Sequence, residues 1–522
     1  MKNPIWPARK RPAYFNALST FAFCALIAGC NVGPKYHPPT MTAPPLYKES
    51  PAQFKQTGDW TVAQPQDAAL RGKWWEIYND PELNQLEEQL TIDNQNIREA
   101  FENFMEARAL VREARSQYFP TVSIGPAYTA SRSSGTLKSI GGASTATGTG
   151  TASSSTSSGN QSQEFSLPAE VSWAPDLWGR VRNTVRAGQY TAQVSAADLA
   201  NERLTEQASL AEYFFEIRGQ DQLQRILDDT VVADKKALDI NRGLYDTGVG
   251  DQISVVEAQT TLHNAESLAI NAGVARAQFE HAIATLIGKP ASEFSIPVKP
   301  ETNAPPPIPV GLPSQLLERR PDVAAAERTM AAANAQIGVA YAAYYPTLTI
   351  PAGGGVESSA LKNLLEWPSR FWSVGPSISE TVYDGGLRRA TVNQYIATYN
   401  ADLAAYRQAV LVAFQQVEDY LAEVRILSQQ IQRQQQAVDS SQTFLKLEMG
   451  RYENGIDPYI DVVTAQTTLL GNQQTLANIQ VLEMTASVEL IEALGGGWDA
   501  SQLPTPAQVT AKPSIAETTI QK

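Results

Sequence analysis

Cysteine is almost absent from this chain of 522 residues, and both of its cysteines, Cys24 and Cys30, lie near the N-terminus. A disulfide framework or a cysteine-ligated metal site in the body of the chain is therefore excluded. The three histidines are far apart and show no zinc-binding spacing. No G-x-x-x-x-G-K-[ST] phosphate-binding loop occurs either. We therefore expect no enzyme activity, no metal and no cofactor other than a covalent lipid.

Excess positive charge is lacking as well, because acidic residues outnumber basic ones and the formal net charge is −13. Binding to nucleic acid needs clustered lysine and arginine, so no nucleic-acid partner is expected. Beyond the N-terminus no apolar run reaches the roughly 20 residues of a membrane-spanning helix. Any later membrane crossing would have to be made by β-strands.

The N-terminus itself reads as an export signal. A basic stretch, Lys2 to Arg11, precedes an apolar stretch, Ala13 to Ala28, and small residues precede Cys30. Residues 1–29 are therefore predicted to be a signal peptide, and the end of this segment resembles a lipobox, which would place a lipid such as palmitate on Cys30. Asn31 follows, rather than an aspartate, and this favours the outer membrane. The alternative is an ordinary signal peptide with an incidental cysteine.

The chain contains an internal repeat. Tyr245 to Leu262 can be laid on Tyr452 to Leu469 at an offset of 207 residues, and 10 of the 18 positions are identical. A stretch rich in serine, threonine and glycine, 131–163, interrupts the first copy and is predicted to be a loop. We predict a lipidated, proline-rich segment over 30–79, the first repeat over 80–288, a linker over 289–313, the second repeat over 314–494 and a flexible tail over 495–522.

Each repeat has the same predicted order of elements. A helix opens it, over 80–118 or 314–344, and two strands with period-two alternation follow, over 122–128 and 165–173 or over 348–352 and 372–378. A very long helix comes next, over 182–245 or 388–452, and a glycine-containing turn leads into a returning helix. One apolar heptad column runs along each long helix, which suits the wall of a hollow tube or a solvated coiled-coil spacer equally well.

Four strands in one chain are too few to close a membrane barrel, because single-chain barrels begin at about eight strands. An open sheet edge in lipid would leave backbone groups unpaired, so transmembrane strands would have to be pooled between subunits. A trimer would contribute twelve strands to one barrel. The competing interpretation is a small soluble sandwich.

The turns at the far ends of the long helices are the candidate functional site. Gly248 and Gly455 are expected to supply left-handed backbone for the reversals. Asp457 and Asp461 would form rings of like charge in a trimer, which would attract cations and could control a constriction. The alternative is that these acids only cap helices, and Asp251 and Asp457 are well placed for that.

Several motifs together indicate a family, and the chain resembles the TolC-like outer-membrane efflux factors, in particular the lipoprotein branch that serves resistance-nodulation-division pumps. The resemblance covers nearly the whole mature chain and rests on motifs in the family's order. They are Cys30 to Tyr36, Trp74-Trp75, Asp80 to Leu83, Asn94 to Ile97, Leu316 to Val323 with Glu327, and the two Tyr-x-x-Gly turns.

The resemblance implies the fold, which is mainly α-helical with a membrane β-barrel. In it, a homotrimer forms a twelve-stranded β-barrel in the outer membrane, continued by a twelve-helix α-barrel across the periplasm. It also implies a periplasmic gate at the turns, whose residues here would be Tyr245, Tyr452, Asp457 and Asp461. Adaptor docking would use the same turns, with Gly248, Gly455, Arg451 and Ser254. Ser254 stands where the family has an acid, so the locking pair of the family is not reproduced.

The predicted function is a passive export duct in the outer membrane, anchored there by lipid. Its predicted partners are outer-membrane lipid, a periplasmic adaptor and an inner-membrane transporter that supplies the energy and selects drugs, toxic small molecules or metal ions. The alternatives are a lipid-anchored coiled-coil spacer without a lumen, and the outer-membrane duct of a protein secretion system.

Overall fold

The computed structural model describes residues 31–39, 43–44, 47–49, 72–132, 161–300, 304–308 and 318–512, and Cys30 lies outside these ranges. The described residues form two compact units. A sheet unit contains 31–36, 110–132, 161–188 and 333–398, and a helical unit contains the others. Helices with residues in both units are α3 (Gln95–Ser116), α4 (Arg180–Asp246), α7 (Pro321–Ala342) and α8 (Leu387–Glu453).

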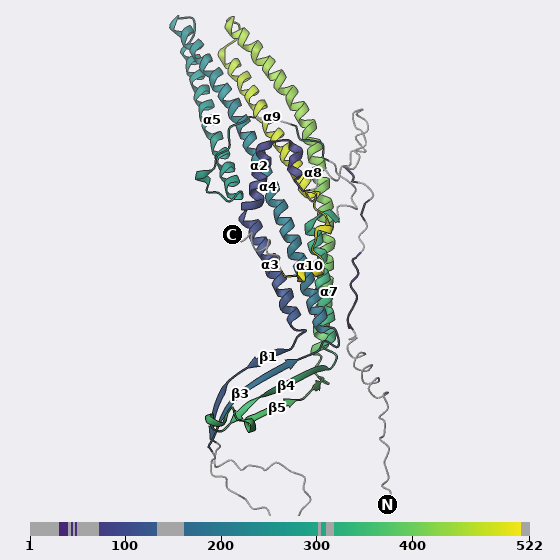
Figure 1. Ribbon diagram of the computed structural model, residues 1–522. Helices are drawn as coiled ribbons and strands as arrows, with labels where there is room; N and C mark the ends of the chain where they lie inside the picture. The colour runs from purple at the N-terminus through teal and green to yellow at the C-terminus, as the bar shows by residue number, and fades with distance from the viewer. Residues whose placement is uncertain are drawn as a thin grey trace, which may run out of the picture. The chain divides into compact units, whose positions relative to one another are not determined.

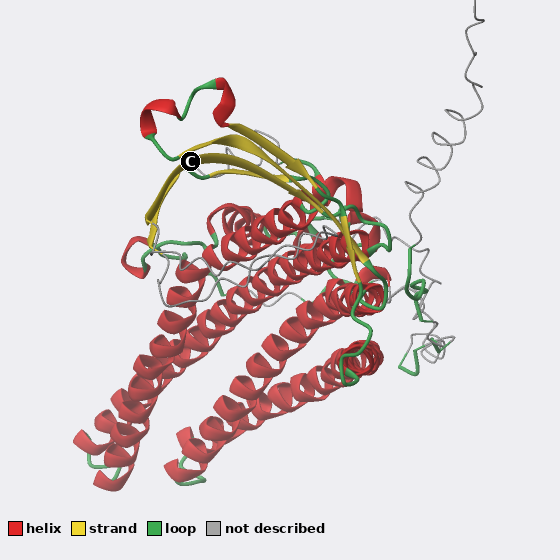
Figure 2. Ribbon diagram, turned by 90° about the horizontal axis from the view of Figure 1, so that it is seen from below, coloured by secondary structure: helices red, strands yellow, loops and turns green. Residues whose placement is uncertain are grey.

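The sheet unit contains one antiparallel sheet, whose strands follow one another across it in chain order and form a curved band (Figure 2). Its strands are β1 (Thr121–Ile124), β2 (Ala127–Arg132), β3 (Gln161–Trp173), β4 (Thr347–Ser358), β5 (Arg370–Val374) and β6 (Ser377–Ser379). Proline follows glycine at 125–126 and at 375–376, which divides each outer strand in two because proline cannot donate to a ladder. The predicted strands are therefore confirmed, although β2 and β3 extend into the predicted loop. The outer edges of β1, β2, β5 and β6 have no strand partner among the described residues.

The register separates the two faces of the sheet by polarity. Val122 is opposite Val171, which is opposite Ala352, which is opposite Val374. One residue further along, the row across the other face is Ser123, Glu170, Gly353 and Ser373. The apolar face is open, since Trp372 is 82% exposed, and Ile124, Tyr128 and Ile378 are exposed too.

Residues 31–34 are hydrogen-bonded and closely packed to the rest of the sheet unit. The Val32 amide donates to the Trp178 carbonyl at 3.2 Å, and the Val32 carbonyl accepts from Asn183 Nδ2 at 3.2 Å. Gly33 lies so close to Gly338 that a Cβ atom would be 2.6 Å from the Gly338 Cα. The chain is therefore fixed from the second residue after Cys30.

Aromatic side chains gather where the strands meet the ends of the helices within this unit. The rings of Trp178 and Tyr345 stack at 4.8 Å, and Trp178 Nε1 donates to the Pro346 carbonyl at 2.7 Å. Trp173 Nε1 donates to the Tyr118 carbonyl at 3.0 Å. The nitrogen of each indole is thus hydrogen-bonded within the unit, and the apolar part of the ring can contact an apolar environment.

The helical unit is dominated by two helix hairpins of equal length (Figure 1). The first consists of α4 and α5 (Gln252–Leu286), and the second of α8 and α9 (Tyr459–Ala493). The long helices have 67 residues each and the returning helices 35 each. All four boundaries are separated by the offset of 207 residues found in the sequence, so the long-helix predictions are confirmed. Among the described helices, none combines the length and hydropathy that a membrane-spanning helix needs.

The helix predicted over 80–118 is wrong in one respect, because it is two helices, α2 (Pro81–Asp93) and α3. Asn94 separates them with extended backbone and caps α3, accepting from the Ile97 amide at 2.9 Å. Its amide nitrogen donates to Glu206 and to the Leu286 carbonyl, while Asn96 also donates to Glu206. The Asn-x-Asn motif therefore joins α2, α3 and α4.

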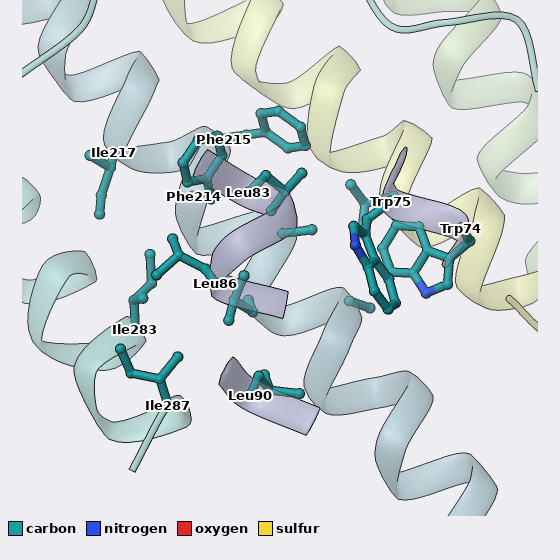
Figure 3. Close-up of a cluster of buried hydrophobic side chains, with 14 of the residues drawn as sticks. Trp74, Trp75, Leu83, Leu86, Leu90, Phe214, Phe215, Ile217, Ile283 and Ile287 are labelled. Carbon is teal, nitrogen blue, oxygen red and sulfur yellow. The ribbon is translucent and has the colours of Figure 1, made fainter. Parts of the chain in front are cut away.

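Two further family motifs belong to the core of the helical unit. Trp74 and Trp75, in a short 3-10 helix (Trp74–Tyr78), are buried in a cluster with Leu83 and Phe214 (Figure 3). Arg320 pairs with Asp322 through two contacts of 2.6 and 2.9 Å and donates to the Ala493 carbonyl. These motifs therefore stabilise the packing of helices rather than line a site.

The flexible tail predicted over 495–522 is wrong for residues 495–512, which are ordered and packed in the helical unit. Helix α10 (Pro506–Thr510) buries Val509 completely, and Gln193 Nε2 donates to the Pro504 carbonyl at 2.8 Å. Arg108 donates to the Ala511 carbonyl at 3.1 Å. Polar side chains on α3 and α4 hold the tail through its backbone carbonyls, a contact that leaves no pattern in the tail's own sequence.

Candidate functional site

The two reversals of the hairpins have the same backbone geometry. We call residues 241–254 the first tip and 448–461 the second tip. Gly248 has φ +75° and donates to the Tyr245 carbonyl at 2.9 Å, and Gly455 has φ +69° and donates to the Tyr452 carbonyl at 2.8 Å. Left-handed backbone at this position ends a helix and satisfies its last carbonyls, and glycine adopts it without strain. The predicted role of both glycines in the turn is confirmed.

The two tips differ in how the returning helix begins. Asp251 caps α5, accepting from the Ser254 amide at 2.7 Å, and this hydrogen bond lowers the pKa of Asp251. The Ser254 backbone amide thus completes this cap. Asp457 does not cap α9, because the N-cap residue there is Pro458 and has no side-chain hydrogen bond. The capping alternative therefore holds for Asp251 and is wrong for Asp457.

Asp457 instead forms an ion pair with Arg451. Arg451 Nη2 donates to Asp457 Oδ1 at 2.9 Å, and Nε donates to the second carboxylate oxygen. This pairing lowers the pKa of Asp457. Glu448 and Asp461 lie beside the pair, and the oxygens of the three carboxylates are within 4.8 Å of one another. One guanidinium faces three acids, so the second tip keeps an excess of negative charge.

A hydrogen bond joins the two hairpins near the tips. The Tyr452 hydroxyl donates to Asn241 Oδ1 at 2.6 Å, and the Tyr452 ring packs against Tyr459 at 5.3 Å between centroids. Tyr459 is buried with Leu238, Leu262 and other apolar residues from both hairpins. Tyr245, at the same place in the first repeat, is 46% exposed, and its hydroxyl makes no hydrogen bond to a described residue. The two predicted gate tyrosines therefore have different environments.

A buried acid lies in the same region. Asp234 is 2% exposed, and neither of its carboxylate oxygens has a hydrogen-bond partner among the described residues. The pKa of Tyr459 is raised first by its own burial and then by the nearby Asp234. Burial raises the pKa of Asp234 to about 6. The contact between the hairpins therefore contains a carboxyl group that changes charge near neutral pH.

Sequence reasoning missed Asn241, Glu448 and Asp234. Asn241 and Glu448 occupy the same position of the two repeats, four residues before Tyr245 and Tyr452. Residues four apart share one face of a helix. A polar residue at this place in both copies was therefore a usable signal, whereas nothing in the sequence distinguishes Asp234 from a solvated aspartate.

Comparison with known proteins decides the family. The sequence profile described as "Outer membrane efflux protein" matches residues 86–289 and 312–496, which together are well over half of the chain. This chain belongs to the outer membrane efflux protein family. Among relatives, the antibiotic efflux pump outer membrane protein ArpC of Pseudomonas putida is 27% identical over 484 residues, covering 92% of this chain and 95% of that protein. The solvent efflux pump outer membrane protein SrpC of the same organism is 28% identical over 496 residues, covering 94% and 99%.

Solved structures of outer-membrane channels have the same fold. The outer-membrane channel OprN superposes with a TM-score of 0.77 at 27% identity, covering 90% of this chain and all of that chain. The Campylobacter jejuni CmeC outer membrane channel superposes with a TM-score of 0.79 at 19% identity, covering 94% and 99%. The TolC-like fold inferred from the sequence is thus confirmed. This member of the efflux family is an outer-membrane component of an efflux system.

Proposed function

We propose that three copies of this chain form a passive export duct through the outer membrane and into the periplasm. In this proposal the duct receives its cargo from an inner-membrane resistance-nodulation-division transporter through a periplasmic adaptor. The chain itself performs no catalysis, and the transporter supplies the energy.

The observation that carries this proposal is the two-faced sheet with unpaired edges. Its apolar face is open and its opposite face carries small and polar residues. An apolar face suits lipid and a polar face suits a water-filled lumen. Unpaired edges are not tolerated in lipid, so the edge of β1 and β2 in one copy would pair with the edge of β5 and β6 in the next. Three copies then close a barrel of twelve strands.

The aromatic residues of the sheet unit support a membrane boundary at the helix side of the sheet. Trp173, Trp178 and Tyr345 lie where the strands meet the helices, and tryptophan and tyrosine are enriched at membrane–water interfaces. The strands would thus lie in the membrane, and the helices of that unit would begin at its periplasmic surface.

The tips are proposed to form the periplasmic gate. The Tyr452–Asn241 hydrogen bond would hold the two hairpins of one chain together in the closed form. Asp461 and the Arg451–Asp457 pair, repeated by trimer symmetry, would set the charge of the entrance. Around Gly248 and Gly455 the exposed apolar side chains of Val249 and Ile456 would offer an adaptor a docking surface, with Arg451 and Ser254 beside it.

The relatives suggest a class of cargo. Two of them are named for the efflux of antibiotics and of solvents, and we propose small toxic organic molecules of that kind for this chain. A lipid on Cys30 would assist the barrel rather than replace it, because barrel insertion is far stronger than one or two acyl chains. Mass spectrometry of the mature N-terminus should show acylated Cys30. An unmodified N-terminus at another residue would contradict the lipid proposal.

The barrel can be tested with two neighbouring positions in the middle of β3. Leu167 is on the apolar face and Ser166 is on the polar face. Arginine on a lipid face costs about 2–4 kcal/mol near the bilayer midplane, whereas a lumen position tolerates it. Leu167→Arg should therefore abolish heat-modifiable trimers on gels and conductance in planar bilayers, while Ser166→Arg should retain both. Equal behaviour of the two variants, or an unmodified protein that is monomeric and non-conducting, would favour a spacer without a lumen.

A further inference from the structure

The contact between the two hairpins of one chain indicates how two chains meet. Both hairpins have the same boundaries at an offset of 207 residues. In a ring of such chains each hairpin has two neighbours, one from its own chain and one from the next copy. Inside the chain, one face of the first hairpin contacts the second hairpin. At the boundary between chains, the corresponding face of the second hairpin therefore contacts the first hairpin of the next copy.

Inside the chain, the three side chains of the contact nearest the tips, Asn241, Met449 and Tyr452, carry no charge. Asn241 of α4 accepts the hydrogen bond of Tyr452, and Met449 of α8 packs against the same apolar cluster between the hairpins. Met449 and Tyr452 are three residues apart and share one face of α8. The hydrogen bond of this contact thus pairs an amide with a hydroxyl, and a thioether packs on the adjoining apolar cluster.

Shifting these three residues by 207 gives the corresponding residues at the chain boundary. Asn241 becomes Glu448, Met449 becomes Arg242, and Tyr452 becomes Tyr245. The residues on both sides have changed together: the first hairpin has a base where the second has Met449, and the second hairpin has an acid where the first has Asn241. Such paired substitution is expected if the two positions face each other across the boundary between chains, because an unpaired charge at an interface is costly.

The residues concerned are available for this contact. Arg242 is exposed and makes no ion pair with a described residue, and the Tyr245 hydroxyl likewise makes no hydrogen bond there. Phe444, which corresponds to the buried Ala237, is 42% exposed. Glu448 belongs to the acidic group that Arg451 neutralises only in part. The second tip thus offers an apolar side chain and excess negative charge, and the first tip offers a free cation and a free hydroxyl.

We propose that Arg242 and Tyr245 of one copy bind the Glu448 carboxylate of the next copy, by an ion pair and a hydrogen bond. This inference rests on the homotrimer of the proposed function. Neutral contacts within chains and ionic contacts between chains then alternate around the tips. Salt screens the ion pairs between chains more strongly than the uncharged hydrogen bond inside each chain. Raising the ionic strength therefore opens the boundaries between chains first.

Charge reversal in the full-length trimer tests the pairing. Arg242→Glu and Glu448→Arg should each place like charges together, raise single-channel conductance and remove the part of its increase with salt that exceeds the increase in bulk conductivity. The double variant restores the pair with opposite polarity and should return both properties to those of the unmodified protein. Lys236→Glu makes the same change of charge on an exposed part of the same helix and should leave both properties unchanged. Additive effects in the double variant would overturn the proposal.

A cross-link gives a second, independent measurement. Tyr245→Cys combined with Glu448→Cys, treated with a short bismaleimide, should give covalent dimers and trimers on denaturing gels, which neither single variant gives. Asn241→Cys with Tyr452→Cys should be linked within the monomer. A protein that is trimeric by mass but shows no link between chains would overturn this inference and leave the duct standing. A monomeric protein would overturn both.

Discussion

Tyr452 and Asn241 are 211 residues apart in the chain, yet the tyrosine hydroxyl lies 2.6 Å from the asparagine side-chain oxygen. Asn241 is 2% exposed, and its amide nitrogen is already used by the Ala237 carbonyl at 2.9 Å. The tyrosine is therefore the partner that satisfies the buried Asn241 oxygen, and separation of the hairpins would expose this bond to water. Because water can replace the tyrosine as a donor, this hydrogen bond can be broken and formed again as the hairpins separate and return.

Tyr452→Phe should favour the open form of the tips. The ring packing on Tyr459 is kept, but the Asn241 oxygen loses its donor, and an unsatisfied buried acceptor costs about 1–3 kcal/mol. The expected result is a higher conductance in planar bilayers without loss of the trimer. Tyr383→Phe, at a tyrosine that is 88% exposed, is the matched control and should have no effect. An unchanged conductance would show that the hydrogen bond does not hold the gate.

The charge at the entrance should depend on Asp461 more than on Asp457. Arg451 neutralises Asp457, whereas Asp461 adds to the excess negative charge of the tip. Replacing both acids with alanine should lower cation preference and raise conductance, Asp461→Ala alone should give most of the loss of preference, and Arg451→Ala should increase cation preference. Reversal potentials across a salt gradient measure each change. Equal effects of Asp457→Ala and Asp461→Ala would contradict the ion pair.

Acidification should tighten the contact between the hairpins through Asp234. Its pKa is raised to about 6, so the folded, closed form prefers the protonated carboxyl, and the stability it adds grows as the pH falls from 7 toward 4. The shift corresponds to about 3 kcal/mol at most for each chain. Thermal unfolding of the trimer should therefore show a rise in stability between pH 7 and pH 5. Asp234→Asn should be more stable at pH 7 and should lack this part of the pH dependence. A variant with an unaltered pH profile would exclude Asp234 as its cause.

Two glycines close together on the second hairpin should respond oppositely to alanine. Gly455 has a left-handed backbone, which costs a non-glycine residue roughly 1–2 kcal/mol, although no atom obstructs a Cβ there. Gly450 is helical and equally open, so alanine should stabilise α8 by about 1 kcal/mol. Gly455→Ala should thus lower the midpoint of thermal unfolding and Gly450→Ala should raise it. Identical shifts would mean that the turn is not fixed by Gly455.

The sequence predicted those features that repeat or alternate. The long helices and the glycine turns follow from local periodicity and from the similarity of the two copies, so their ends were found to within two residues. The break at Asn94 and the ordered tail depend on contacts with Glu206, Gln193 and Arg108, which are remote in sequence and have no periodicity. The Arg451–Asp457 pair was missed as a pair because an aspartate before a helix usually serves as a cap.

The attachment of residues 31–34 to the sheet unit determines what a lipid on Cys30 could do. The Val32 amide is bound to the Trp178 carbonyl, so Asn31 is the one residue between Cys30 and a fixed point. A lipid attached by so short a segment could reach the membrane only directly beside this fixed point. Its acyl chains would have to enter the bilayer beside Trp178 and Tyr345, so the lipid would set the depth of the duct in the membrane. Inserting a flexible segment after Asn31 would remove that constraint while leaving the lipid in place.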